Sequence, residues 1–424
     1  MRLIVKKTEK IRGESNVPSS KSHTIRGLIF ASLAKKKSIL HNALESEDTK
    51  ATINACTSLG AEFSKIHDGE FQITGFDGYP KIKKTEINTL NSGTTTNFIT
   101  SVAALANKKI IIDGDESIRR RPVEPLLIAL RNLGAHAASL KKNGCPPIEI
   151  KGRMIGGKTT LDCSSSQYLS SLMISCPLLN EDTEILISNC CEIPYIEMTL
   201  KWLEEMHIKY HNKEFSEIQI FGDQKYSPFE KTIPSDWSSA TFLIASAVML
   251  GEIVTLRNLD PDDSQADRYV LDYLRNMGAD IKIEDTNITI SKSKLRGCEL
   301  DLNNTPDALP AMAVLGCYSE GTTILKNVAH ARIKETDRIR VMTQELTKMG
   351  AKIKERDDGM VILHSNLKGA RLSGHYDHRV VMALSLAGMI AEGKTEIDTA
   401  EAIKVTFPNY VGIMKELGAK ISLE

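Results

Sequence analysis

Cationic and hydroxyl side chains gather at several predicted helix starts of this chain. Lys21, Ser22 and Arg26 share one start, and Ser22 and Arg26 are four residues apart, on one helix face. The rest of that helix is apolar, so we expect Arg26 to lie near a packed face. A fixed cation beside free helix N–H groups is an arrangement that binds anions.

Two further segments carry groups suited to anions. Pro122 fixes the backbone directly after Arg121, which makes Arg121 the best candidate for an anion clamp within the Arg119–Arg121 run. The alternative is a solvated surface, where most arginine runs lie. The turn at residues 91–95 (NSGTT) enters a helix with small residues and could let a phosphate approach backbone N–H groups.

Acidic groups that could move protons stand at two other helix starts. In residues 330–340 (HARIKETDRIR), Glu335 is an acid flanked by Lys334 and Arg338. A salt-bridged helix start is the ordinary alternative. Asp307 follows Pro306 and could equally be a simple helix cap.

The triplet Asp377-His378-Arg379 opens a strongly apolar helix, so its charges have little structural justification. No GxxxxGK[ST] motif is present, which argues against a P-loop kinase. The histidines lack the HExxH spacing of a zinc site, so we expect no metal and no cofactor.

A repeated pattern positions these residues. An amphipathic helix ending in Leu/Met-Gly-Ala, followed by an alternating strand, recurs six times, with Gly60, Gly134, Gly278, Gly350 and Gly418 at its end and His207 in the third copy. These positions are 68 to 74 residues apart. The glycine suits the left-handed residue that ends a helix.

A second element keeps the same period. It is a polar cluster followed by a small and apolar helix and a β-branched strand, marked by Ser22, Thr94, Ser165, Ser239, Asp307 and Asp377. Six ordinary capped helices of a repeat scaffold would give a similar pattern. The segments beginning at Val17 (VPSSKS) and Ile233 (IPSDWS) are 216 residues apart, which predicts two domains of three βαβαββ units each.

Composition excludes several classes of protein. Lys+Arg and Asp+Glu both number 54 and aromatic residues are 5%, so neither the charge nor the stacking surface of a nucleic-acid binder is present. The N-terminal segment resembles a first strand rather than a signal peptide, and apolar runs are too short for a membrane span. The eight scattered cysteines form no CxxC pair, which favours a reduced, cytoplasmic protein.

With PSSKSHTIR, NSGTT, RRRP, SSSQYL, TPDA, IKETDR, DHR and TFPNY in this order, the chain resembles the 5-enolpyruvylshikimate-3-phosphate synthase family over essentially its whole length. The resemblance implies the α/β enolpyruvyl transferase fold, an inside-out α/β barrel of two similar domains with the active site in the interdomain cleft. The chain would cross twice, so residues 1–18 and 234–424 would form one domain and residues 19–233 the other.

The resemblance also implies the reaction. Such an enzyme transfers the enolpyruvyl group of phosphoenolpyruvate to the 5-hydroxyl of 3-phosphoshikimate and releases phosphate. We expect a monomer with small-molecule substrates only. By the same resemblance, Asp307 would act as base and Glu335 as acid, with Lys21 as a further participant.

Substrate contacts follow by the same resemblance. The 3-phosphoshikimate site would be formed by Lys21, Ser22, Arg26, Ser165, Ser166, Gln167, Tyr195, Asp307, His330 and Lys334. The phosphoenolpyruvate site would be formed by Lys21, Gly93, Arg121, Gln167, Arg338, Arg379 and Lys404.

Several positions depart from the family's usual residues. His330 stands where Asn is common, Asn97 where Arg is common, and Glu192 where Ser is common. A carboxylate beside a phosphate would repel it, so we expect Glu192 to point away. Val405 replaces a common Lys, with Lys404 one position earlier.

Two other functions compete with this interpretation. The UDP-N-acetylglucosamine enolpyruvyl transferases share the fold, but their loop ahead of Arg-Pro typically carries a reactive Cys, and this chain has Glu116 there. A non-catalytic scaffold that binds a polyanion would spread basic residues over a face, which the neutral balance does not favour.

Overall fold

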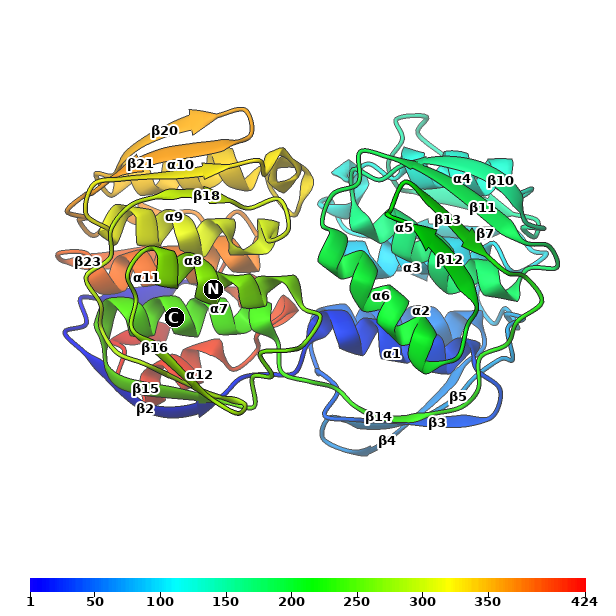
Figure 1. Cartoon of the computed structure of the whole chain (residues 1–424), viewed down its shortest axis with the longest axis horizontal. Coiled ribbons are helices and arrows are strands. Elements are labelled where there is room, and N and C mark those ends of the chain that lie inside the picture. Colours follow the sequence, from blue (N-terminus) through cyan, green and yellow to red (C-terminus); the bar gives the residue numbers. More distant parts are fainter. The chain divides into compact units, whose positions relative to one another are not determined.

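The computed structural model describes residues 1–424 and separates into two compact units. Residues 1–18 and 234–424 form one, the terminal unit. Residues 19–233 form the other, the central unit. Each is a layered α/β structure in Figure 1.

Six four-stranded sheets carry the repeat, three in each unit. In every sheet one edge strand pairs in parallel with its neighbour and the other two strands add antiparallel, as in the sheet of β6 (Glu86–Asn88), β7 (Ile110–Asp113), β9 (Ile148–Lys151) and β8 (His136–Ser139). In this sheet α3 (Gly93–Ala103) makes the crossover that the parallel pair requires, and β8 and β9 follow the second helix, α4 (Glu124–Asn132), as a hairpin. This is the βαβαββ unit, and the predicted α/β fold class is confirmed.

The elements of the central unit follow the repeat in chain order: α1 (Lys21–Leu33), β3 (Lys37–His41), α2 (Glu47–Leu59), β4 (Glu62–His67), β5 (Glu70–Thr74), β6 (Glu86–Asn88), α3 (Gly93–Ala103), β7 (Ile110–Asp113), η1 (Ile118–Arg120), α4 (Glu124–Asn132), β8 (His136–Ser139), β9 (Ile148–Lys151), β10 (Gly157–Asp162), α5 (Ser166–Ser175), η2 (Cys176–Leu178), β11 (Thr183–Ser188), α6 (Ile193–Glu205), β12 (Tyr210–Lys213), β13 (Glu217–Ile220) and β14 (Glu230–Thr232).

The elements of the terminal unit are: β1 (Leu3–Lys6), β2 (Ile11–Asn16), α7 (Trp237–Leu250), β15 (Gly251–Arg257), η3 (Ala266–Tyr269), α8 (Val270–Asn276), β16 (Ile281–Glu284), β17 (Asn287–Ile290), β18 (Glu299–Asp301), η4 (Pro306–Ala308), α9 (Leu309–Tyr318), β19 (Thr322–Lys326), η5 (Ala329–Ile333), α10 (Arg338–Lys348), β20 (Lys352–Arg356), β21 (Gly359–Leu363), β22 (Arg371–Leu372), α11 (His378–Ile390), β23 (Lys394–Ile397), η6 (Ala400–Val405), α12 (Tyr410–Glu416) and β24 (Ile421–Leu423).

Strands β2 and β14 explain the double crossing. β2 pairs in parallel with β15 of the terminal unit, although the chain then leaves for the central unit. β14 pairs in parallel with β3 and completes the first sheet of the central unit just before the chain returns. Each crossing thus follows a strand that closes a sheet.

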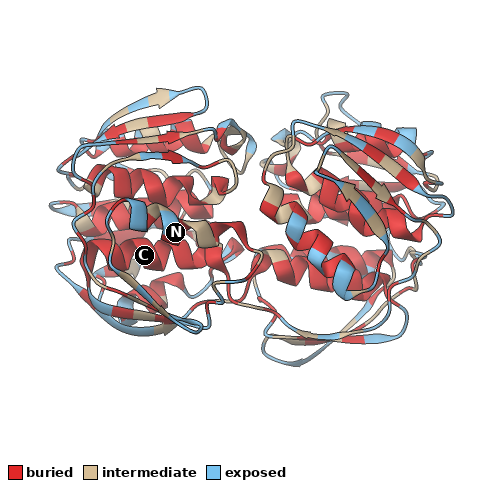
Figure 2. Ribbon diagram, in the orientation of Figure 1, coloured by how far each residue is buried: buried red, intermediate tan, exposed pale blue.

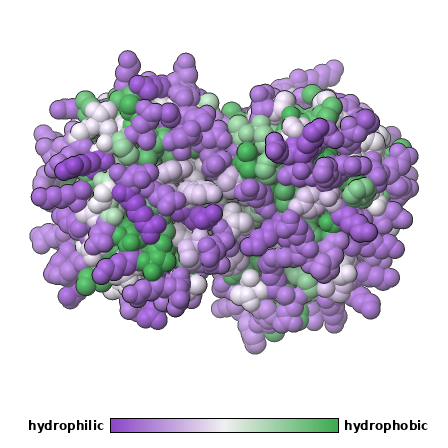
Figure 3. Space-filling view, in the orientation of Figure 1, coloured by the Kyte–Doolittle hydropathy of each residue, from purple (hydrophilic) through white to green (hydrophobic).

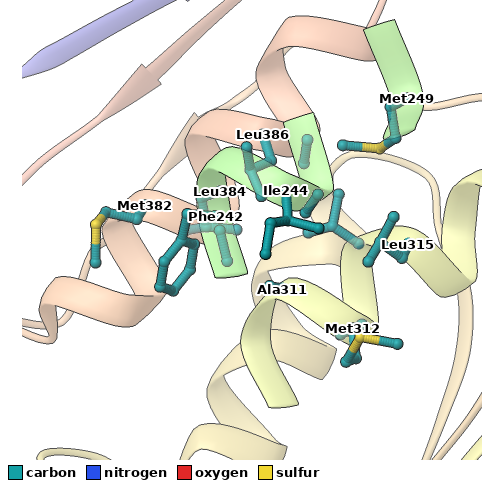
Figure 4. Close-up of a cluster of buried hydrophobic side chains, with 14 of the residues drawn as sticks. Phe242, Ile244, Met249, Ala311, Met312, Leu315, Met382, Leu384 and Leu386 are labelled. Carbon is teal, nitrogen blue, oxygen red and sulfur yellow. The ribbon is translucent and has the colours of Figure 1, made fainter. Parts of the chain in front are cut away.

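The core of each unit is built on helices that are apolar all round. In the terminal unit α7, α9 and α11 pack against one another, and Figure 4 shows their interlocking side chains. The labelled residues are Phe242, Ile244, Met249, Ala311, Met312, Leu315, Met382, Leu384 and Leu386, all buried. In the central unit α3 packs against α1 and α5. Figure 2 shows these helices buried along most of their length, so only their starts can present polar groups.

The predicted glycine ends of the amphipathic helices are confirmed. Gly60, Gly134, Gly278, Gly350 and Gly418 have φ between 90° and 122°, in the region that favours glycine. His207 takes the same place in the third copy with a φ of 58°.

The visible face of each unit is mostly hydrophilic, with scattered apolar residues (Figure 3). None of the helices combines the length and the apolar character needed to span a membrane.

Candidate active site

Arg338, the first residue of α10, is the centre of a charged cluster in the terminal unit. Its side chain is fully buried and contacts three carboxylates. Nε donates to Asp377 Oδ2 at 2.8 Å, Nη1 to Asp307 Oδ1 at 2.6 Å, and Nη2 to Glu335 Oε2 at 2.7 Å. Burial opposes the charge, but the Asp377, Glu335 and Asp307 carboxylates raise the pKa of Arg338 well above its ordinary value.

Asp307 bridges two arginines. Its second oxygen, Oδ2, lies 2.8 Å from Nη2 of Arg379, whose side chain is only 4% exposed. With the groups ionised, two guanidinium groups meet three carboxylates, a net charge of −1. A carboxylate held between two arginines can accept a proton if an anionic ligand draws the cations away.

The start of α11 fixes this geometry. Asp377 is the N-cap, and its Oδ1 accepts from the backbone N–H of Arg379 at 2.9 Å. Its Oδ2 accepts from Arg338 and from Thr336 Oγ1. One side chain thus caps α11 and orients the Arg338 guanidinium, which is a structural role for Asp377 that the sequence did not reveal.

Asp267 of η3 was not predicted from the sequence. It is buried, and the hydroxyl of Ser238 donates to its Oδ2. Burial, and next the nearby Asp307 carboxylate, raise the pKa of Asp267 to about 7, although Arg379 lowers it. A carboxyl group that titrates near neutrality, close to the arginine cluster, is a candidate functional group.

Other predicted residues of the terminal unit lie at varying distance from this cluster. His330 lies within the 3-10 helix η5, Lys334 directly follows that helix, and both are partly exposed. Lys404 lies on η6, is exposed and makes no side-chain hydrogen bond or ion pair, while Val405 is buried. The role predicted for Lys404 stays a prediction.

In the central unit, α1 brings Lys21, Ser22 and Arg26 to one helix start. Lys21 is buried, and its Nζ lies 3.4 Å from Oδ2 of Asp48, at the start of α2. Asp48 was not predicted from the sequence either. A signal was present, because Asp48 and Asp267 are 219 residues apart, close to the 216 between the two Pro-Ser segments.

Arg26 is buried, with 2% of its surface exposed, as the apolar helix predicted. Its Nε donates to Thr199 Oγ1 at 2.9 Å, Nη1 to the Ser22 carbonyl at 3.1 Å, and Nη2 to the Tyr195 carbonyl at 3.0 Å. Burial lowers the pKa of Arg26 to about 9, so it stays cationic at neutral pH. Three of its five N–H donors are used, and all three partners are neutral oxygens.

Gly93 and Arg121 meet at the start of α3. A Cβ at Gly93 would lie 2.5 Å from Nη1 of Arg121, so the guanidinium rests directly on the glycine. Arg121 Nη2 donates to Ser117 Oγ at 3.0 Å. Tyr168 of α5 donates to the Pro122 carbonyl at 2.7 Å and ties the arginine loop to the next helix. The predicted clamp therefore lies over a helix N-terminus.

Gln167 is held by residues of the neighbouring helix α3. Its Nε2 donates to Thr94 Oγ1 at 3.3 Å, and its Oε1 accepts from Asn97 Nδ2 at 2.7 Å. Asn97, at a position where the family commonly has Arg, thus orients a predicted substrate-binding side chain.

The expectation for Glu192 is wrong. Ser165 is the N-cap of α5, and Glu192 is buried with its Oε2 turned toward the start of that helix. This oxygen accepts from Ser166 N at 3.2 Å and from Ser166 Oγ at 2.7 Å. The N–H group at the helix start and the serine hydroxyl attract the carboxylate and hold it there. Tyr195, on the first turn of α6, is half-buried.

The fold and these two clusters are those of an α/β enzyme, with cations at helix starts that suit small anionic molecules and carboxylates that suit proton transfer. Residues 5–414 match the family described as EPSP synthase (3-phosphoshikimate 1-carboxyvinyltransferase), and the chain belongs to this family. It is a transferase of the shikimate pathway of aromatic amino-acid biosynthesis.

Individual relatives agree with this assignment. The 3-phosphoshikimate 1-carboxyvinyltransferase of Acetivibrio thermocellus is 48% identical over 422 residues, which cover 100% of this chain and 99% of the relative. That of Methanocaldococcus jannaschii is 41% identical over 430 residues, with 100% and 99% covered. A solved EPSP synthase structure from Acinetobacter baumannii matches with a TM-score of 0.84 at 25% identity, covering 99% of each chain.

These findings confirm the family resemblance. The family and both relatives carry the name 3-phosphoshikimate 1-carboxyvinyltransferase, and not that of the UDP-N-acetylglucosamine enolpyruvyl transferases. The described residues contain no group of three or more His, Cys, Asp or Glu side chains that could hold a metal ion.

Proposed function

We propose that this chain transfers the enolpyruvyl group of phosphoenolpyruvate to the 5-hydroxyl of 3-phosphoshikimate, and that both clusters act on the two substrates. The observation that carries the proposal is Asp307, whose two carboxylate oxygens bind Arg338 and Arg379 separately. These arginines are the residues expected to bind phosphoenolpyruvate, so the same event can bind the substrate and release a base.

The chemistry needs one acid and one base. The methylene carbon of phosphoenolpyruvate takes up a proton while the 5-hydroxyl attacks its C2, and the hydroxyl loses its proton. The tetrahedral adduct then loses phosphate and a proton from the methyl carbon. We assign Asp307 as base toward the hydroxyl and Glu335 as the acid toward the methylene carbon, with Lys21 as a further participant.

The ion pairs of the terminal unit suggest the order in which substrate binding and proton transfer would occur. Before substrate binds, Arg338 holds both Asp307 and Glu335 and favours their ionised forms. The phosphate and carboxylate of phosphoenolpyruvate would compete for Arg338 and Arg379. As the cations turn to the substrate, both carboxyl groups gain proton affinity, which suits a base and an acid.

The remaining roles divide between the two substrates. For 3-phosphoshikimate, we propose that Arg26 and Ser22 hold the ring carboxylate, and that Ser165, Ser166 and Gln167 hold the phosphate. Tyr195 would lie under the ring, with His330 and Lys334 near the phosphate. For phosphoenolpyruvate, we propose Gly93, Arg121, Gln167, Arg338, Arg379 and Lys404, with Lys21 in contact with both substrates.

The first test is phosphate release from 3-phosphoshikimate and phosphoenolpyruvate in chelator, without nucleotide. The second is Asp307→Ala, with Asp307→Asn as the variant of equal shape. We expect both to bind each substrate but to lose turnover by roughly 10²–10⁴-fold, the range for loss of a positioned base. The exposed Asp301→Asn is the matched control. Turnover of Asp307→Ala at the rate of Asp301→Asn would refute the role as base.

The monomeric state stays a prediction of the family resemblance, and the cytoplasmic location stays a prediction from the scattered cysteines. Size-exclusion chromatography with light scattering tests the first. A stable dimer at assay concentration would contradict it.

A further inference from the structure

We propose that Glu192 is an internal anion that competes with the phosphate of 3-phosphoshikimate and thereby sets the affinity for this substrate. The inference rests on the proposed function, because it assumes that Ser165 and Ser166 hold the phosphate. Glu192 is 2% exposed, and its Oε2 accepts both the backbone N–H and the hydroxyl of Ser166.

The start of α5 explains why a carboxylate lies there. The first N–H groups of a helix have no partner within the helix, and its dipole favours negative charge. Ser165 Oγ accepts from Gln167 N at 3.4 Å, and Glu192 takes the donors of Ser166. The carboxylate thus fills the position that a phosphate oxygen would take at the same helix start.

The backbone holds Glu192 in this position. The residue precedes α6 with φ 56° and ψ 41°, a left-handed conformation that is unfavourable for a residue other than glycine and is kept only where the surroundings enforce it. One residue earlier, Cys191 N donates to the Cys163 carbonyl at 3.2 Å and ties the approach to α6 to the approach to α5. The carboxylate can leave the helix start only by a side-chain rotation.

Binding of the phosphate therefore has two anions competing for the same two donors. The phosphate must displace the carboxylate from Ser166 or share the site with a second negative charge, and both weaken binding. Shikimate, which lacks the phosphate, can bind with Glu192 in place. The serine that is common at this position in the family would carry no such charge.

The test compares the wild type with Glu192→Gln and Glu192→Ser by calorimetric titration with 3-phosphoshikimate and, separately, with shikimate. Gln keeps an oxygen that both Ser166 donors can reach, and Ser is the residue common in the family. We expect about tenfold tighter binding of 3-phosphoshikimate in both variants and shikimate affinity within twofold of wild type. KM for 3-phosphoshikimate should fall in parallel, while KM for phosphoenolpyruvate changes less than threefold.

Glu197→Gln is the matched control, since Glu197 is exposed on the same helix α6 and its loss changes the net charge equally. It should bind 3-phosphoshikimate like the wild type. Thermal unfolding identifies any variant that loses its fold. If one Glu192 variant does not fold, the affinity of the other for 3-phosphoshikimate tests the proposal. Unchanged or weaker binding of 3-phosphoshikimate in the folded variants overturns the proposal. A wild type that neither binds the substrates nor releases phosphate would instead refute the proposed function.

Discussion

Arg338 of the terminal unit and Arg26 of the central unit are both buried arginines at helix starts, yet their surroundings are opposite. Arg338 contacts the carboxylates of Asp307, Glu335 and Asp377, and its pKa is raised well above the ordinary value. The hydrogen bonds of Arg26 go only to neutral oxygens, its guanidinium lies 5.1 Å from the centre of the Phe98 ring, and burial lowers its pKa to about 9.

The difference indicates how each unit would contribute to the proposed function. A buried cation with neutral partners keeps an uncompensated charge, which an anionic ligand can satisfy. A buried cation that is already surrounded by carboxylates binds an anion only by displacing one of them. Under the proposed function, the central unit would therefore offer binding charge directly, whereas the terminal unit would couple binding to the release of proton-transfer groups.

The largest effect is expected when Arg338 is replaced by Met. Removing the shared cation leaves three carboxylates close together in a buried place, and breaking a buried ion pair in this way typically costs about 3–5 kcal/mol. Urea unfolding should show this loss in the free energy of unfolding. Arg340→Met, at an exposed position of α10, is the control and should lie within about 0.5 kcal/mol of wild type. Equal free energies of unfolding for Arg338→Met and Arg340→Met would show that the three carboxylates around Arg338 do not depend on its charge, and the contrast with Arg26 would be lost.

Asp267→Asn sharpens the electrostatic description of the terminal unit. The folded pKa of Asp267 is about 7 and the ordinary value is 3.8, so the folded protein holds a proton that the unfolded chain releases between these values. The contribution of this group to stability is present below pH 4 and falls as the pH rises to 7. The unfolding free energy of the variant relative to wild type should therefore increase by up to about 4 kcal/mol between pH 4 and 7.

Urea unfolding at a series of pH values measures this difference. Asp272→Asn, at an exposed position of the adjacent helix α8, removes one carboxylate outside the buried cluster and is the control. A variant curve for Asp267→Asn parallel to wild type would show that this carboxyl group is ionised in the folded protein well below neutral pH.

Arg26→Met tests the other side of the comparison. Arg26 donates to two helix carbonyls and to the Thr199 hydroxyl. The Thr199 hydroxyl also bonds Ser170 Oγ, so it keeps a partner when the guanidinium is removed. We expect the free energy of unfolding to stay within about 1 kcal/mol of wild type, because an apolar replacement for a buried charge is often neutral. Binding of 3-phosphoshikimate should weaken about 30-fold, as for loss of a charged hydrogen bond.

Titration calorimetry and urea unfolding of the same sample separate the two quantities. The exposed Arg120→Met controls for the loss of one positive charge. A large loss of stability with unchanged affinity would assign Arg26 to the scaffold.

The sequence predicted what depends on local spacing. The six-fold period, the glycine helix ends and the burial of Arg26 follow from patterns within one helix and its turn. The pairings that define the site were not predictable in this way. Arg338 is 31 residues from Asp307 and 39 from Asp377, and Glu192 is 26 from Ser166. Which carboxylate accepts from a given donor depends on how neighbouring repeats pack. The N–H groups at a helix start attract an anion whether it belongs to the substrate or to the protein.

The smallest expected effect comes from Gly93→Ala, which moves a cation of the central unit without removing its charge. The new Cβ would lie 2.5 Å from Arg121 Nη1, the far end of a flexible side chain, so the guanidinium must shift while α3 stays in place. A displaced clamp binds less well, and we expect KM for phosphoenolpyruvate to rise about tenfold with little change for 3-phosphoshikimate. Gly316→Ala, whose Cβ would lie 2.9 Å from Ile362 Cδ1 in the core of the terminal unit, is the matched steric control. It should lower stability and leave both KM values unchanged. Equal KM shifts in the two variants would show that the effect of Gly93→Ala is general strain. A rise in KM for phosphoenolpyruvate in Gly93→Ala alone would instead place Arg121 among the cations of the central unit that bind an incoming anion.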